Sequence, residues 1–128
     1  MIWFVALGGA LGSAARYAMV SLAQRIWGAS FPFGTLGVNV IGGFLIGATL
    51  PSLAASATVS PQVRAFVVVG VLGGFTTFSA FSFETVTLLQ QGQYRNAVAY
   101  VALSVGLSLA ATLAGVAVGG AGAGTARA

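Results

Sequence analysis

The sequence predicts an all-α integral membrane protein with four transmembrane helices in a single domain. Of its 128 residues, 58% are hydrophobic, whereas only five are basic and one is acidic. A soluble domain devotes about a quarter of its residues to charge, so this chain lacks the polar surface that water requires. Four apolar stretches are also long enough to cross a bilayer, which takes about 20 mostly apolar residues in a helix.

The four stretches are separated by polar segments that contain proline or glycine. In chain order, the predicted spans are residues 2–26, 33–53, 62–90 and 96–119. The start lacks the basic flank of a signal peptide, so it is interpreted as the first span. Gly28, Ser30 and Pro32 indicate the first loop, a proline-bounded connector follows the second span, and QQGQYR forms the last turn. The single domain is expected over residues 1–119, with a flexible Gly/Ala-rich tail over 120–128.

Glycines at helix-packing spacing recur in three of the predicted spans. The GxxxG pairs are Gly8 with Gly12, Gly43 with Gly47, and Gly70 with Gly74. Small residues at this spacing let helix backbones approach closely in lipid. We therefore expect most of these glycines to serve packing.

The arginines are balanced across the membrane. Four spans place Arg64 and Arg127 on one side and Arg25 and Arg95 on the other, while Arg16 is embedded in the first span. Orientation normally follows an excess of Lys and Arg in the cytoplasmic loops. Because no excess exists here, the chain is expected to insert both ways up. This permits an antiparallel dual-topology homodimer.

Several function classes are excluded by composition. The chain has no cysteine and no histidine, so disulfides, thiol chemistry and the commonest metal ligands are absent. One acidic residue cannot form a catalytic pair of carboxylates, and an enzyme is not expected. Scattered arginines form no basic patch, so nucleic acid is not an expected partner.

Two polar side chains are expected within the first two spans. Asn39 has donors and an acceptor that suit either a contact between helices or a pore-lining group that binds an anion. Arg16 suits either a side chain that reaches the membrane surface or an electropositive vestibule that attracts anions. The second interpretation is favoured for Arg16, and both stay open for Asn39.

Polar groups also occur in the last two spans. Hydroxyl residues recur every four positions along the fourth span, at Tyr100, Ser104, Ser108 and Thr112. Each step of four turns about 40° around a helix, so they form a slowly curving polar track whose protons can face an anion. Glu84 lies near the end of the third span, where we expect a structural ion pair or a helix-end contact.

The stretch GGFTTFSAF, residues 73–81, predicts a break in the third helix at mid-membrane. Gly73 and Gly74 lower helix stability by about 1 kcal/mol each, and two β-branched threonines follow. Carbonyls freed by a break would suit a small cation such as Na⁺. Phe78 and Phe81 share one face, and the positive edge of an aromatic ring can contact an anion.

Three motifs resemble the signatures of the Fluc fluoride channels, also called the CrcB family. They are GGALGSAARY, GTLGVNVIGG and GGFTTFSAFSFE, which begin at Gly8, Gly34 and Gly73. The resemblance covers essentially the whole chain except the tail. Ala80 departs from it, because the family often has threonine there. The resemblance implies antiparallel dual-topology homodimers in the bacterial plasma membrane, with two fluoride pores and a central Na⁺.

The resemblance also implies roles for individual residues. Arg16 matches the vestibule arginine, and the carbonyls of Gly73 and Thr76 match the sodium ligands. The pore residues that it implies are Asn39, Phe78, Phe81, Tyr100, Ser104, Ser108 and Thr112.

The function expected from this resemblance is passive export of fluoride, which lowers its cytoplasmic concentration. One alternative is a small dual-topology multidrug or cation exporter. Such exporters centre on a carboxylate in the first helix, whereas the first span here holds Arg16 and no acid. A membrane scaffold subunit is a third hypothesis, which would explain the glycines but not Asn39 with the hydroxyl track.

Overall fold

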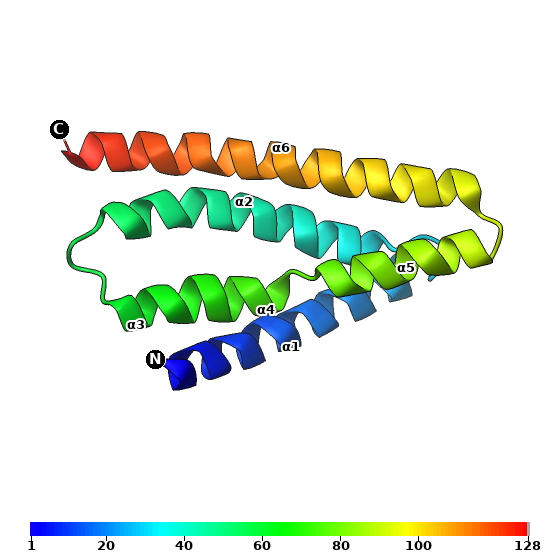
Figure 1. Ribbon diagram of the computed structural model, residues 1–128, viewed down its shortest axis with the longest axis horizontal. Helices are drawn as coiled ribbons and strands as arrows, with labels where there is room; N and C mark the ends of the chain where they lie inside the picture. The colour runs from blue at the N-terminus through cyan, green and yellow to red at the C-terminus, as the bar shows by residue number, and fades with distance from the viewer. Residues whose placement is uncertain (128) are drawn as a thin grey trace.

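The protein is a bundle of four membrane-length helical segments (Figure 1). The structure, a computed structural model, describes the backbone of residues 1–127 and the side chains of residues 1–121, and this part contains no strand. The elements are α1 (Ile2–Trp27), α2 (Phe33–Ala55), α3 (Pro61–Arg64), the π-helical η1 (Ala65–Leu72), α4 (Gly73–Phe75), α5 (Phe78–Gln90) and α6 (Tyr94–Arg127). Together α3, η1, α4 and α5 form the third span, so the four predicted spans are confirmed.

The helix ends differ from the prediction by at most two residues, except that α6 ends eight residues later. The second helix continues through Pro51 to Ala55; proline removes one helical hydrogen bond, and the packing of α2 along α6 supports the rest. The fourth helix continues past Gly119 to Arg127. The predicted tail is thus helical in its backbone up to that residue, while residue 128 lies outside the described part. Flexibility of the tail stays a prediction.

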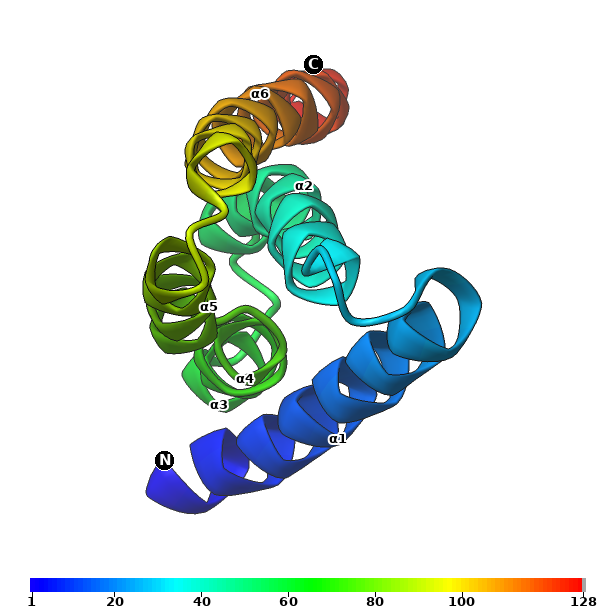
Figure 2. The same ribbon diagram turned by 90° about the vertical axis from the view of Figure 1, so that its right-hand side faces the viewer.

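The helices approach one another closely where they carry glycine, and these close contacts join them into two packed layers (Figure 2). α1 crosses η1 and α4, and α2 lies along α6. A Cβ added at Gly70 would lie 2.8 Å from the Cα of Gly8, and one at Gly43 would lie 2.8 Å from Thr112 Oγ1. Gly12, Gly47 and Gly74 are equally crowded by backbone atoms of a neighbouring helix. The packing role predicted for the three GxxxG pairs is therefore confirmed.

Apolar side chains cover most of the outer surface. Trp3 is 77% exposed and Leu113 is 71% exposed, and many other large apolar residues resemble them. The small buried core includes Val38, Leu88 and Tyr100. Soluble monomers rarely expose apolar area on this scale, so the surface is suited to lipid or to another protein.

The third span departs from helical geometry at two threonines. Thr76 has φ −83° and ψ 157°, and Thr77 has φ −153° and ψ 119°. The preceding Gly73 and Gly74 remain in α4. Thr77 begins the next helix, because its Oγ1 accepts a hydrogen bond from the Ala80 amide at 3.1 Å. Threonine is a favoured N-cap residue, which explains why α5 starts here.

Candidate functional site

A cavity of about 340 Å³ lies beside the extended threonines, between α2, α5 and α6. Its lining residues are Asn39, Thr76, Thr77, Phe78, Phe81, Ser104, Val105, Ser108 and Leu109. Five of the seven residues expected to form a pore thus meet at one site, although they come from three separate helices. The cavity combines one amide, several hydroxyls and two aromatic rings, and it contains no charged side chain.

Asn39 pairs with the main chain of Thr77. Its Nδ2 donates to the Thr77 carbonyl at 3.0 Å, and its Oδ1 accepts from the Thr77 amide at 2.8 Å. The side chain therefore replaces helical partners that extended backbone lacks. An amide nitrogen carries two hydrogens, so one donor remains beyond this pair. The contact between helical segments expected as one alternative for Asn39 is confirmed; Asn39 also lines the cavity, and its binding of an anion stays a prediction.

Two serine hydroxyls in the cavity wall have no partner within the described structure. The Oγ atoms of Ser104 and Ser108 are buried and make no hydrogen bond. Leaving a buried polar group unsatisfied costs about 1–3 kcal/mol, so such groups in a native fold require an explanation. Both residues line the cavity, so a rotation of either side chain would turn its hydroxyl towards a ligand that accepts hydrogen bonds.

The two phenylalanines form an aromatic wall. The ring centroids of Phe78 and Phe81 lie 5.6 Å apart, with an angle of 53° between the ring planes. Phe81 also packs against Tyr100 at 5.2 Å, whereas Phe78 is 78% exposed in the single chain. An aromatic ring presents a positive rim, so this wall can face an anion without carrying a charge.

Tyr100 and Thr112, at the two ends of the hydroxyl track, lie outside the cavity lining. Tyr100 is fully buried and donates its hydroxyl to Glu84 Oε2 at 3.1 Å. Thr112 donates to the Ser108 carbonyl at 2.8 Å. The turn of about 40° at each four-residue step carries the two ends of the track away from the face that Ser104 and Ser108 share.

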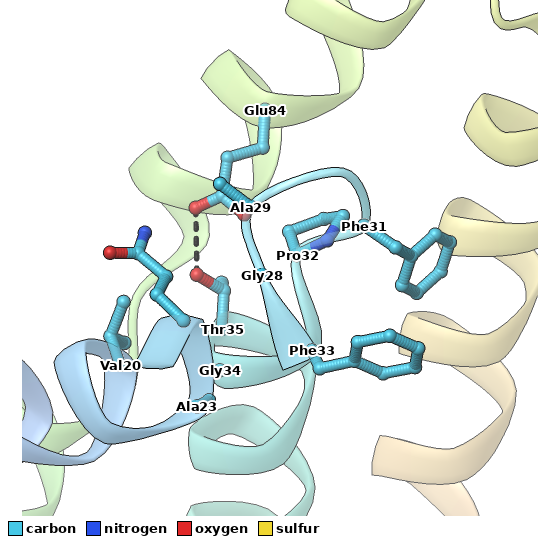
Figure 3. Close-up of a pocket in the computed structure, with 11 residues that line it drawn as sticks. Val20, Ala23, Gly28, Ala29, Phe31, Pro32, Phe33, Gly34, Thr35 and Glu84 are labelled. Atoms are coloured by element: carbon cyan, nitrogen blue, oxygen red, sulfur yellow. Dashed lines mark hydrogen bonds between the residues drawn. The ribbon is translucent and has the colours of Figure 1, made fainter. Parts of the chain in front are cut away.

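Of the two contacts expected for Glu84, an ion pair or a helix-end contact, the described structure shows no basic partner but a contact with Thr35 at the start of α2. Thr35 donates to Glu84 Oε1 at 2.7 Å, opposite the bond from Tyr100 to Oε2. In Figure 3 the carboxylate extends from α5 towards Thr35 at the start of α2, beside the loop from Gly28 to Pro32. Sequence reasoning missed Thr35, although it lies one helical turn before Asn39. It also did not include Thr77 among the site residues, although the two threonines were part of the predicted break; Thr77 is the N-cap residue of α5.

The remaining predicted residues lie around α4. Arg16 Nε donates to the Gly74 carbonyl at 3.1 Å, which brings a positive charge close to the extended threonines. Two carbonyls there lack their usual helical donors. The Thr77 amide bonds Asn39 instead of the Gly73 carbonyl, and the Ala80 amide bonds Thr77 Oγ1 instead of the Thr76 carbonyl.

Comparison with known proteins decides the family. Residues 3–116 match the family model described as "CrcB-like protein, Camphor Resistance (CrcB)". The chain belongs to the CrcB family. Its curated relatives include three proteins named "Fluoride-specific ion channel FluC". The one from Cereibacter sphaeroides is 52% identical over 88% of this chain and 89% of its own length. Those from Rhizobium etli and Thermus thermophilus are 47% and 50% identical, each over 91% of this chain and 93% of the relative.

Membership of the CrcB family agrees with the architecture. The match covers all four membrane-length helices except the last part of α6. The CrcB family consists of ion channels rather than enzymes. This CrcB protein is therefore a multi-pass bacterial membrane protein.

Proposed function

We propose that this CrcB protein is a passive, fluoride-selective channel that lets fluoride leave the cell and so lowers its cytoplasmic concentration. The names of its relatives support fluoride as the ion. The chemistry of the cavity supports the same choice, because it offers hydrogen-bond donors and ring edges and no charged side chain.

The observation that carries the proposal is the pair of unpartnered hydroxyls at Ser104 and Ser108. A selective pore must replace the water molecules that an ion gives up with groups of its own. Both hydroxyls can turn their protons towards fluoride, and the second amide hydrogen of Asn39 and the rims of Phe78 and Phe81 supplement them. Several weak sites in series allow the ion to enter without being trapped.

Positive charge at the approach to the pore would raise the local anion concentration. We assign this vestibule role to Arg16. Its Nε donates to the Gly74 carbonyl beside the extended threonines. Tyr100 and Thr112 would continue the polar path on either side of the two serines. No titrating group is needed within the cavity, so fluoride would move down its own electrochemical gradient.

The functional unit that we propose is an antiparallel dual-topology homodimer with two pores. The equal number of arginines expected on the two sides of the membrane supports insertion in both orientations. The exposure of Phe78 beside the cavity supports a second copy that covers it. In this arrangement the extended residues Thr76 and Thr77 lie at mid-membrane as a true break of the third helix. Non-helical backbone at that depth is tolerated where protein buries it.

A structural sodium ion fits the carbonyls of Gly73 and Thr76. Neither carbonyl has its usual helical donor, and small hard cations favour oxygen ligands. A bound Na⁺ would supply positive charge that offsets the dipoles of these carbonyls. Equivalent carbonyls of the second copy would complete the ligand set and hold the two subunits together.

A multidrug or cation exporter is a weaker candidate. Its defining carboxylate in the first helix is absent here, since Glu84 is the only acidic residue and belongs to α5. The match to the CrcB family model also argues against an exporter. No contact in the structure favours the scaffold hypothesis.

Removing the two serine hydroxyls tests the proposal. We expect Ser104→Ala and Ser108→Ala each to slow fluoride efflux from proteoliposomes about tenfold or more, because a hydrogen bond to a charged group contributes about 1.5–3 kcal/mol. Thermal stability in fluoride-free detergent should stay equal or rise, because each substitution removes a buried hydroxyl that has no partner. Efflux is followed with a fluoride electrode.

Thr87→Ala serves as the matched control. The Thr87 hydroxyl donates to the Phe83 carbonyl within its own helix and lies outside the cavity. Its removal should leave efflux unchanged. Wild-type efflux rates in both serine variants would contradict the proposal that these hydroxyls bind the ion.

A further inference from the structure

Glu84 carries the only negative side-chain charge of the sequence, and no cation balances it in the described structure. It lies partly buried in the membrane-length third span. Its two contacts are neutral hydroxyls, from Thr35 and Tyr100. Of the two arginines of α1, Arg16 donates to the Gly74 carbonyl instead, and Arg25 in the last turn does not line the cavity at Glu84. An uncompensated carboxylate in such a place costs several kcal/mol, so it is neutralised either by a counter-ion or by a proton. The hydroxyls that donate to both of its oxygens favour the ionised form.

A second cavity opens at this carboxylate. It measures about 160 Å³ and is enclosed by the end of α1, the loop between α1 and α2, the start of α2, and Glu84 (Figure 3). Because one water occupies about 30 Å³ in the liquid, an ion and several waters fit inside. The cavity is separate from the one that contains Ser104 and Ser108, since no residue lines both. None of its lining residues is basic.

Oxygen atoms dominate the polar groups of this cavity. An ionised carboxylate has about four acceptor positions, and the two hydroxyls occupy two of them. The Thr35 hydroxyl donates a hydrogen bond to Glu84. The lone pairs of the Thr35 oxygen point away from that bond and stay free to accept. Gln24 and the loop residues Gly28, Ala29, Phe31, Pro32 and Phe33 line the same space. Oxygen ligands of this kind suit hard cations rather than transition metals.

We propose that this cavity binds a monovalent metal cation of the sodium type as the counter-ion of Glu84. A single carboxylate matches a single positive charge, whereas divalent cations are usually held by more than one charged ligand. The site differs in place and in ligands from the carbonyls of Gly73 and Thr76. It depends on the charge and the cavity alone, and not on the proposed fluoride function.

Sodium binding by the purified full-length protein tests the site directly. Equilibrium dialysis with radioactive ²²Na⁺ should show that Glu84→Gln binds one sodium ion fewer per chain at saturation than the wild type. Thr35→Val retains the charge but removes one ligand oxygen, so it should weaken this class of sites at least tenfold. Thr49→Val is the matched control, because the Thr49 hydroxyl bonds the Leu45 carbonyl on the exposed side of the same helix.

The number of sodium ions that the wild type binds also distinguishes the Glu84 site from a single sodium ion shared between two subunits. A sodium ion shared on a twofold axis accounts for one ion per two chains, and the new site adds one ion per chain. Saturation at no more than one ion per two chains would overturn the inference, as would equal binding by the wild type and Glu84→Gln. In that case a proton would be the counter-charge. Neither readout uses fluoride flux, so loss of the proposed function would leave this result interpretable.

Discussion

Replacing Phe78 or Phe81 by isoleucine is expected to abolish fluoride efflux while leaving assembly intact. Isoleucine keeps an apolar side chain but lacks the ring quadrupole whose positive rim can contact an anion. Phe78 gives the cleaner test, because its ring is largely exposed in the single chain and contributes little to the core. Phe81 also packs against the buried cluster around Leu88 and Tyr100, so its replacement should lower thermal stability as well.

Phe83→Ile is the matched control for both variants. Phe83 belongs to the same helix and is 73% exposed, but it lies outside the cavity lining. Its replacement should leave efflux unchanged. Gel filtration in detergent checks assembly, and a fluoride electrode measures efflux from proteoliposomes. Unaltered efflux in the Phe78 and Phe81 variants would remove the aromatic wall from the mechanism.

Asn39→Leu is expected to damage both the fold and the pore. Leucine has a similar size but can make neither hydrogen bond to Thr77, so the amide and carbonyl of Thr77 lose their partners. Each unsatisfied buried group costs about 1–3 kcal/mol. The variant should therefore unfold at a lower temperature and conduct little or no fluoride.

Hydrogen exchange locates this effect. A peptide that covers Thr76 to Phe78 should exchange faster in Asn39→Leu, because the Thr77 amide is no longer held by Asn39 Oδ1. Ile41→Leu, a change on the exposed side of the same helix, should retain the wild-type exchange rate. Protection of the Thr77 amide that survives in Asn39→Leu would show that Asn39 does not support the extended backbone.

Hydropathy was enough to predict the four spans, because a membrane-length apolar segment has few alternatives to a helix. The ends were less predictable. The second span was predicted to end at residue 53, two residues after Pro51, yet α2 continues to Ala55 because contacts with α6 outweigh one missing hydrogen bond. The glycine-rich segment after Gly119 suggested a loss of helix, yet the backbone stays helical to Arg127. Gly115 and Gly119 pack against the backbone of α2 just before that segment. Tertiary packing therefore overrides local propensity at Pro51.

The extended residues in the third span show a similar limit. The predicted break rested on Gly73, Gly74 and the two threonines that follow, but Gly74 serves the crossing with α1 and stays helical. The extended residues are Thr76 and Thr77, and their partner comes from Asn39, which is 38 residues away. A contact over that separation depends on how helices pack, which spacing alone does not determine.

Most residues of the candidate site could be predicted from the sequence, but the contacts between them could not. Asn39, Phe78, Phe81, Ser104 and Ser108 meet in one cavity, although they are spread over three helices. The turn of a straight helix explains why only the middle of the hydroxyl track faces that cavity. The hydroxyls of Thr35 and Tyr100 on Glu84 became visible only when three helices were placed together.

The most direct test of the account is electrical coupling of fluoride efflux from vesicles that contain the wild-type protein. Vesicles loaded with potassium fluoride should release fluoride only when a potassium ionophore such as valinomycin balances the charge, and potassium chloride should not be released. This result is expected because neutral hydroxyls, an amide and ring edges pass the ion alone. Efflux that proceeds without the ionophore, or that requires a proton gradient, would contradict a passive channel.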